Sequence, residues 1–150
     1  MIAIPKGGSA DPGLLIGYCF GHGHANEHTQ QRTVAGNCHS IAEGEVTRES
    51  LDQVADDLRA NLTLWGKQPK GGHVYYVVIA LNPGDRPVSD PEWRTIAEDY
   101  LTARGITDPD KAGVRWTAVN HGSSEVGADH VHLAISLVRD DGTMVSTWQD

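Results

Sequence analysis

The sequence predicts an α+β fold with a mainly antiparallel central sheet and helices packed on it. Strand-like and helix-like segments follow in the order strand, helix, helix, strand, helix, strand, strand. Strands that occur in segregated pairs are typical of this class. The chain has 150 residues, which is enough for one domain with a buried core. We therefore expect a single domain over residues 1–150.

The first half of the chain is predicted to hold one short strand and two helices. Residues 1–8 have the pattern of a short strand followed by a loop. A helix then begins with Ser9 or Asp11 as its cap, and it carries Tyr18 in its last turn because glycines follow. The second helix, residues 47–65, has a capping signal at its start and an apolar stripe at helical spacing.

A polar, histidine-rich segment, residues 22–29, lies between these helices and is expected to be a loop. Residues 34–38 are expected to form a brief extended piece. The strongest strand pattern, rich in β-branched and aromatic side chains, covers residues 73–81. A capping box that begins at Ser89 then opens a third helix, which is expected to end near Arg104.

The last third of the chain is predicted to be mostly strand. Residues 114–120 and 130–138 are hydrophobic, β-branched runs, and a turn at residues 139–142 follows them. Residues 144–148 are a candidate for one more strand. The chain stops at Asp150 without an evident terminal element, so we expect it to be the N-terminal fragment of a longer protein.

The charge balance limits the ways in which the chain can act on nucleic acid. Asp and Glu number 20 and Lys and Arg 12, which gives a net charge of −8. A protein that simply coats nucleic acid uses many basic residues, so this charge argues against that class. It does not exclude a nuclease, because a local basic groove and a bound metal ion can dominate the field near one phosphate.

Targeting signals and cysteine pairs are not evident in the sequence. No apolar run approaches the roughly 18 residues that a membrane span requires, and the first residues lack the apolar core of a signal peptide. Cys19 and Cys38 make neither a disulfide framework nor a C-x-x-C site. We expect a cytoplasmic protein that does not act on a membrane.

A His-X-His pair opens the strand-like run after residue 129. Side chains two positions apart on a strand project from the same face, with Cα atoms about 6.6 Å apart, so His130 and His132 would lie side by side. Two imidazoles held in this way can share one divalent metal ion. His121 ends the preceding strand-like run, and antiparallel pairing would bring it to the same rim of the sheet. The pattern predicts a three-histidine metal site, although surface and core histidines are also common on strands.

Three groups of segments in the chain match the motifs of one nuclease family. They are residues 13–21 with 25–28, residues 78–86, and residues 118–122 with 129–132 and 138–142. With these motifs the chain resembles the relaxase or mobilisation nuclease domain, the VirD2- and MobA-like branch of the His-hydrophobe-His (HUH) endonucleases. The first group is similar to the motif in which a helix ends with the nucleophilic tyrosine. The second is similar to a strand with an acidic turn, and the third to the metal motif.

The resemblance implies an HUH-like fold and a metal-dependent nickase that acts at the transfer origin of a plasmid or integrative element. It implies that His121, His130 and His132 hold Mn²⁺ or Mg²⁺, and that Tyr18 attacks a phosphodiester of single-stranded DNA. The product would be a 5′-phosphotyrosine link and a free 3′-hydroxyl. Asp85 matches the acidic turn and would orient a ligating imidazole, or it is a plain turn residue. Accessory origin-binding proteins and a type IV secretion coupling protein are the implied partners.

The position of the tyrosine separates this branch from its relatives. Rolling-circle initiators and related transposases carry the tyrosine after the His-X-His motif, and this chain has none there. Tyr75 and Tyr76 lie inside a strand-like run and Tyr100 lies on an apolar helix stripe, so we interpret all three as structural. Tyr18 is therefore the expected nucleophile. Some relaxases use histidine instead, which makes His28 the reserve candidate.

Two other classes of function are alternatives. A metal-binding β-barrel of the cupin kind also uses His-X-His, but it needs an acidic ligand a few residues later, and residues 133–137 offer none. A non-catalytic DNA- or protein-binding module would leave the three-histidine arrangement unexplained and would tolerate the loss of Tyr18.

Overall fold

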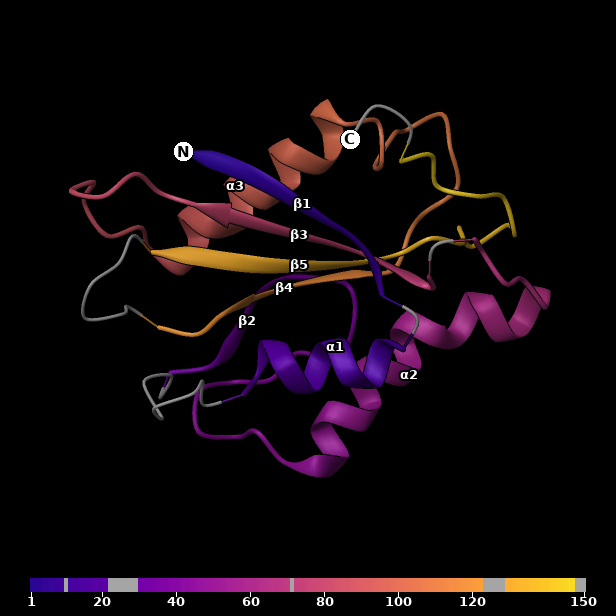
Figure 1. Cartoon of the computed structure of the whole chain (residues 1–150), viewed down its shortest axis with the longest axis horizontal. Coiled ribbons are helices and arrows are strands. Elements are labelled where there is room, and N and C mark those ends of the chain that lie inside the picture. Colours follow the sequence, from indigo (N-terminus) through magenta and orange to yellow (C-terminus); the bar gives the residue numbers. More distant parts are fainter. Residues whose placement is uncertain (10, 22–29, 71, 123–128, 148–150) are drawn as a thin grey trace.

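A computed structural model describes residues 1–9, 11–21, 30–70, 72–122 and 129–147 of the chain (Figure 1). Five strands and three helices lie within them. The elements are β1 (Ile2–Ser9), α1 (Pro12–Cys19), β2 (Arg32–Gly36), α2 (Arg48–Trp65), β3 (Val74–Ala80), α3 (Asp90–Ala103), β4 (Trp116–Asn120) and β5 (His130–Ser136).

The five strands form one sheet in the order β1-β3-β5-β4-β2, and each neighbouring pair is antiparallel. The prediction of an α+β fold with an antiparallel sheet is confirmed. The strand that begins with the His-X-His pair, β5, lies at the centre of the sheet, between β3 and β4. It therefore holds its side chains in register with two flanking strands.

Each face of the sheet is covered by its own helices, as Figure 1 shows. On one face, α1 and α2 pack over a cluster that includes Leu58, Val74 and Val119. On the other face, α3 buries Trp93 against a second cluster that includes Val131. Since side chains alternate along a strand, burial of Val131 beneath α3 turns both neighbouring histidines toward the face of α1 and α2.

The N-terminal ends of the three helices follow from the local sequence as predicted. Asp11 caps α1, and its carboxylate accepts the backbone N–H of Gly13 at 2.8 Å. Thr47 and Ser50 form a reciprocal capping box at the start of α2, and Ser89 and Glu92 form another at the start of α3. These bonds satisfy backbone N–H groups that a helix leaves unpaired. No described helix has the length and apolar character that crossing a membrane requires.

The edge strand β2 and the segment after β5 differ from their predicted bounds or form. The segment expected as a brief extended piece at residues 34–38 is the edge strand β2, which begins earlier, at Arg32. Its register shifts between Thr33 and Ala35, and this irregularity breaks the alternation that identifies a strand. Residues 144–147 form no strand in the described part of the chain; Met144 makes an isolated bridge to Val138.

Candidate metal centre

Three histidines meet at one rim of the sheet. His130 and His132 lie on β5, and His121 directly follows β4. The ring centroids of His121 and His132 are 4.1 Å apart, those of His130 and His132 are 5.0 Å apart, and those of His121 and His130 are 5.7 Å apart. The structure thus brings together the three side chains that the sequence predicted.

The arrangement fits a divalent cation. One ring nitrogen from each histidine lies within 4.8 Å of the other two. A metal ion bonded to three imidazoles at about 2.1 Å brings their nitrogens to about 3 Å from one another, a separation that small side-chain rotations can reach. His121 and His132 are 2% and 5% exposed, whereas His130 is half-buried. Two of the three imidazoles are therefore buried, and the third is partly accessible among the described residues.

Glycine allows the chain to turn away immediately after His121. Gly122 has φ of 92°, a region that other residues rarely adopt. A Cβ at this position would also lie 2.9 Å from the side chain of Gln30. Any other residue would strain the backbone next to His121 or displace Gln30, so this turn favours glycine.

The candidate nucleophile, Tyr18, lies beside this histidine cluster. It sits in the last turn of α1, and its side chain is 63% exposed although the ring contacts the sheet. The Tyr18 ring is edge-on to the His132 ring, with centroids 6.0 Å apart, and edge-on to the Tyr76 ring at 6.4 Å. An exposed phenol thus lies next to the three imidazoles, although α1 and β5 are far apart in sequence.

Tyr76 is a site residue that the sequence analysis missed. Its hydroxyl lies 2.5 Å from Nδ1 of His132, a hydrogen-bond distance, and its ring stacks on the imidazole. Burial raises the pKa of Tyr76, and interactions with Cys19 and Tyr18 raise it further. The interpretation of Tyr76 as purely structural is therefore incomplete. Alternation along β3 turns Tyr76 to the same face as Val78, but the pairing of Val78 with His132 is known only from the structure.

Of the remaining predicted site residues, Asp85 is the one that the structure describes. Asp85 lies in the turn after β3, where its carboxylate accepts the backbone N–H of Asn82 at 3.0 Å. This contact is typical of a turn residue. The suggested role of Asp85 in orienting a ligating imidazole stays a prediction. His28 lies outside the described residues. Cys19 is fully buried, and this burial raises its thiol pKa to about 12, so the thiol stays protonated at neutral pH.

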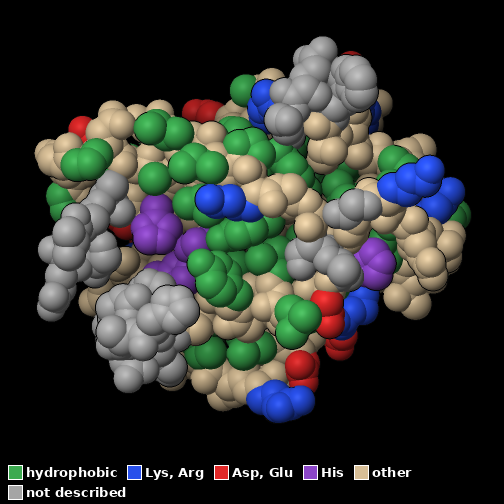
Figure 2. All heavy atoms as spheres, viewed as in Figure 1, with side chains coloured by type: hydrophobic (Ala, Val, Ile, Leu, Met, Phe, Trp, Pro, Cys, Tyr) green, Lys and Arg blue, Asp and Glu red, His purple; other side chains and the backbone are tan. Residues whose placement is uncertain are grey.

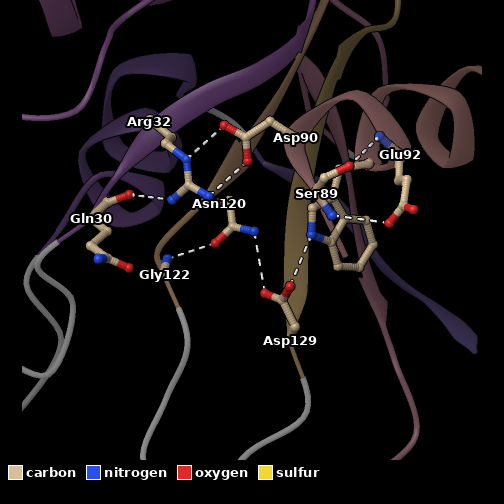
Figure 3. A network of polar contacts seen from close by, with 9 residues as sticks. Gln30, Arg32, Ser89, Asp90, Glu92, Asn120, Gly122 and Asp129 are labelled. Atoms are coloured by element: carbon tan, nitrogen blue, oxygen red, sulfur yellow. Dashed lines mark hydrogen bonds and ion pairs between the residues drawn. The ribbon is translucent and has the colours of Figure 1, made fainter. Parts of the chain in front are cut away.

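A polar clasp joins the residues that directly precede two of the histidines (Figure 3). The carboxylate of Asp129 accepts Nδ2–H of Asn120 at 3.3 Å and the indole N–H of Trp93 at 3.1 Å. The side-chain oxygen of Asn120 accepts the backbone N–H of Gly122 at 2.6 Å. The clasp therefore ties the end of β4 to the start of β5 and ties both to α3, which fixes the spacing between His121 and the two histidines on β5.

An ion pair in Figure 3 holds the neighbouring edge strand. The guanidinium of Arg32 donates to both carboxylate oxygens of Asp90, at 2.9 and 2.7 Å, and to the backbone oxygen of Gln30 at 2.8 Å. Two parallel bonds from one guanidinium fix geometry better than a single contact. Since Arg32 belongs to β2 and Asp90 begins α3, the pair anchors β2 beside the rim that carries the histidines.

Replacing Asp129 with alanine is expected to loosen the metal site and lower stability. The substitution leaves the buried Trp93 indole N–H without its acceptor, at a cost of about 1–3 kcal/mol in the free energy of unfolding. We expect weaker Mn²⁺ binding as well, because the two histidine-bearing strand ends lose their link. Calorimetric titration and urea unfolding of Asp129→Ala, beside Asp85→Ala, measure both effects. A larger loss of affinity in Asp85→Ala would assign the orienting carboxylate to Asp85 instead.

An exposed apolar strip continues from the histidines across the same face of the sheet. Ile2 of β1 pairs with Ala80 of β3, and Ala80 pairs with His130 of β5. In the same way, Ile4 pairs with Val78, and Val78 pairs with His132. Residues paired across antiparallel strands share a face, and both isoleucines are exposed. Figure 2 shows the corresponding surface, on which histidine side chains lie beside a mainly hydrophobic central area.

Comparison with known proteins identifies a family that matches this geometry. Residues 26–150 match the family described as relaxase, MobA/VirD2-like, nuclease domain. No curated protein and no solved structure matched the chain. The matched segment contains His121, His130 and His132, while Tyr18 precedes it. Because the match spans most of the chain and agrees with its antiparallel sheet and its three-histidine rim, the protein belongs to the MobA/VirD2-like relaxase nuclease family.

Proposed function

We propose that the chain nicks one strand of DNA at a specific site by transesterification, with Tyr18 as the nucleophile. The observation that carries this proposal is the exposed Tyr18 ring edge-on to His132, at the mouth of the three-histidine cluster. Membership of a relaxase nuclease family supplies the reaction class. The reaction would serve conjugative transfer or mobilisation, with the nick at a transfer origin.

The proposed step exchanges one phosphoester bond for another. The Tyr18 oxygen attacks the scissile phosphorus, the bond to the 3′-oxygen breaks, and the phenolic proton is balanced by a proton on the leaving 3′-hydroxyl. The DNA keeps a free 3′ end, and its 5′ phosphate is joined to Tyr18. A protonated phenol, with a pKa near 10, is a weak nucleophile. When bound, a divalent cation would neutralise charge on the phosphate and orient it for in-line attack.

The histidines would hold that cation, and their chemistry favours Mn²⁺ over Mg²⁺. His121, His130 and His132 offer three neutral imidazole nitrogens. Mg²⁺ prefers carboxylate, carbonyl and water oxygens and gives up its waters reluctantly, whereas Mn²⁺ belongs to the first-row series of divalent metals that nitrogen ligands bind. Asp85 stays in the proposal as a carboxylate in the adjoining turn that would orient one imidazole. Mn²⁺ is therefore the metal that we expect to support the reaction best.

Single-stranded DNA would lie on the face that carries the histidines. The exposed Ile2 and Ile4 strip and the Tyr18 ring give unpaired bases an apolar surface, and stacking on aromatic rings contributes to sequence-tolerant binding of single strands. We further propose a cytoplasmic reaction in which accessory origin-binding proteins and a type IV secretion coupling protein join a longer form of this chain.

Covalent capture tests the proposal without knowledge of the DNA site. The chain is incubated with single-stranded oligonucleotides that have a randomised centre, in Mn²⁺ or in EDTA, and is then denatured in detergent. We expect a detergent-resistant adduct only with Mn²⁺. Sequencing the captured strands gives the cleavage site, and a free 3′-hydroxyl on the released fragment confirms the polarity of the nick.

Peptide mapping of the adduct identifies the nucleophile. Trypsin leaves Tyr18 and His28 in one peptide, but cleavage after Glu27 separates them. We expect the nucleotide on the peptide that contains Tyr18, in a bond that survives mild acid. An acid-labile adduct on His28 would assign attack to histidine. The absence of any adduct, with metal bound, would reject nicking and leave a metal-binding or nucleic-acid-binding domain.

A further inference from the structure

The hydrogen bond between Tyr76 and His132 determines which nitrogen of His132 faces the cluster. The Tyr76 hydroxyl occupies Nδ1 at 2.5 Å, so Nε2 is the nitrogen that remains for a metal ion. An imidazole that binds metal through Nε2 carries its proton on Nδ1. The phenolic oxygen of Tyr76 can accept that proton in a hydrogen bond, and its own hydroxyl proton stays available for another acceptor.

We propose that Tyr76 is a positioning residue of the metal centre, which holds the His132 ring in the orientation that presents Nε2 to the cation. The inference rests on the proposed function, because it assumes that the three histidines bind a metal ion. It goes further in naming a residue outside the three ligands that tunes the site. Tyr76 reaches the metal through His132 and touches neither DNA nor metal itself.

The packing around Tyr76 restrains the imidazole from a second direction. The rings of Tyr76 and His132 are nearly parallel, with an interplanar angle of 17° and centroids 5.7 Å apart. Tyr18 is edge-on to both rings. Tyr76 thus limits rotation of the ligating ring and also forms part of the surface on which Tyr18 lies. One side chain therefore connects the candidate nucleophile to a candidate metal ligand.

The chemistry of this partner differs from that of a carboxylate. Ligating histidines commonly donate to a carboxylate, a backbone carbonyl or water, and loss of such a partner typically weakens metal binding 10–100-fold. A phenol is neutral, so it can accept the Nδ1 proton of a metal-bound His132 and adds no negative charge next to a site that must accept a phosphate. This property suits a centre whose remaining ligand positions are taken by an anionic substrate.

The neighbouring tyrosine provides a matched control. Tyr75 precedes Tyr76 on β3 but belongs to the core on the opposite face, beneath α3. Both Tyr76→Phe and Tyr75→Phe remove one hydroxyl and keep the ring. If Tyr76 acts only in packing, the two variants should bind metal equally well. If Tyr76 positions His132, only Tyr76→Phe should change the metal site.

Metal titration and NMR test the inference independently of nicking. We expect Mn²⁺ affinity, measured by calorimetry, to fall about 10–100-fold in Tyr76→Phe and to stay within about twofold of the wild-type value in Tyr75→Phe. In the Zn²⁺-loaded protein, the Nδ1–H proton of His132 should give a sharp, exchange-protected resonance that is lost in Tyr76→Phe. Thermal unfolding of the metal-free variants checks that each one folds.

The possible outcomes separate this inference from the proposed function. Unchanged Mn²⁺ affinity in Tyr76→Phe, or a Zn²⁺-loaded wild-type protein with its proton on Nε2 of His132, would overturn the positioning role. If the wild-type chain binds no metal ion, the inference and the metal centre are both wrong. If it binds metal as expected but forms no DNA adduct, nicking is wrong and the positioning role of Tyr76 stands.

Discussion

Replacement of Tyr18 by phenylalanine is expected to abolish the covalent DNA adduct and to leave the fold and the metal site intact. The substitution removes only the hydroxyl, and the side chain is largely exposed, so stability should change by less than about 0.5 kcal/mol. The phenyl ring can keep its edge-on contacts with Tyr76 and His132. Without the nucleophilic oxygen, adduct formation should fall at least about a thousandfold. Denaturing gels of the captured strands give this measurement.

Two comparison variants make the Tyr18 result specific. Tyr100→Phe changes a tyrosine of α3 that packs against the core on the opposite face of the sheet, and it should form adduct at the wild-type rate. His28→Ala should also keep the adduct if tyrosine is the nucleophile. An adduct that persists in Tyr18→Phe and disappears in His28→Ala would transfer the role to histidine. Equal Mn²⁺ affinity in all three variants excludes an indirect effect through the metal.

The three-histidine cluster was predictable because its arrangement follows from local rules. The spacing of His130 and His132 places them on one face of a strand. His121 could be added because β4 and β5 are consecutive and pair in an antiparallel manner, which brings the end of one strand to the start of the next. Tyr18 could be selected only by position in the chain and by resemblance, since nothing local to α1 indicates that it lies beside β5.

Residues that support the three histidines could not be found from local rules. Tyr76 meets His132 because β3 pairs with β5 in a register that places Val78 opposite that histidine, and the two strands are separated by α3 and β4. Asp129 accepts the indole N–H of Trp93, a contact that depends on how α3 crosses the sheet. Both contacts join segments far apart in sequence, so sheet order and helix packing must be known before they can be seen.

The edge strand β2 was only partly recognised for a different reason. Central strands carry long hydrophobic runs, as β5 does, whereas β2 has a register shift between Thr33 and Ala35 and ends at Gly36. A Cβ at Gly36 would lie 2.4 Å from the backbone oxygen of Trp116, and its φ is 119°. Close approach to β4 therefore requires glycine at position 36. Glycine has a poor strand propensity, so the sequence signal for a strand is weak there. Tertiary pairing outweighs local propensity here.

Replacement of His132 by alanine is expected to remove specific metal binding. The substitution deletes the histidine that is central to the cluster, since its ring lies closest to both of the others, and two imidazoles remain. It also removes the partner of the Tyr76 hydroxyl. We expect Mn²⁺ affinity to fall at least about a hundredfold, and adduct formation to fall at least about a thousandfold at fixed metal concentration.

Thermal unfolding with and without metal gives a readout that does not depend on DNA. A ligand that binds only the folded state at 100 times its Kd stabilises it by about 2.7 kcal/mol. For a domain of this size, that stabilisation corresponds to a rise in Tm of about 5–10 °C. The wild-type chain should show this rise with Mn²⁺, and a smaller one with Mg²⁺ because the ligands are imidazoles. His132→Ala should show almost none at the same concentrations.

A histidine far from the cluster provides the control for this experiment. His39 is exposed, and its backbone N–H donates to Asp57, a bond that alanine keeps. His39→Ala therefore removes one imidazole from the chain without touching the cluster, and its metal-dependent rise in Tm should equal that of the wild type. A rise that persists in His132→Ala would place the bound metal elsewhere and would contradict the three-histidine centre. If His132→Ala and His39→Ala lose the metal-dependent rise in Tm equally, the metal binds histidines nonspecifically. In a specific three-histidine site, loss of His132 must have a larger effect than loss of His39.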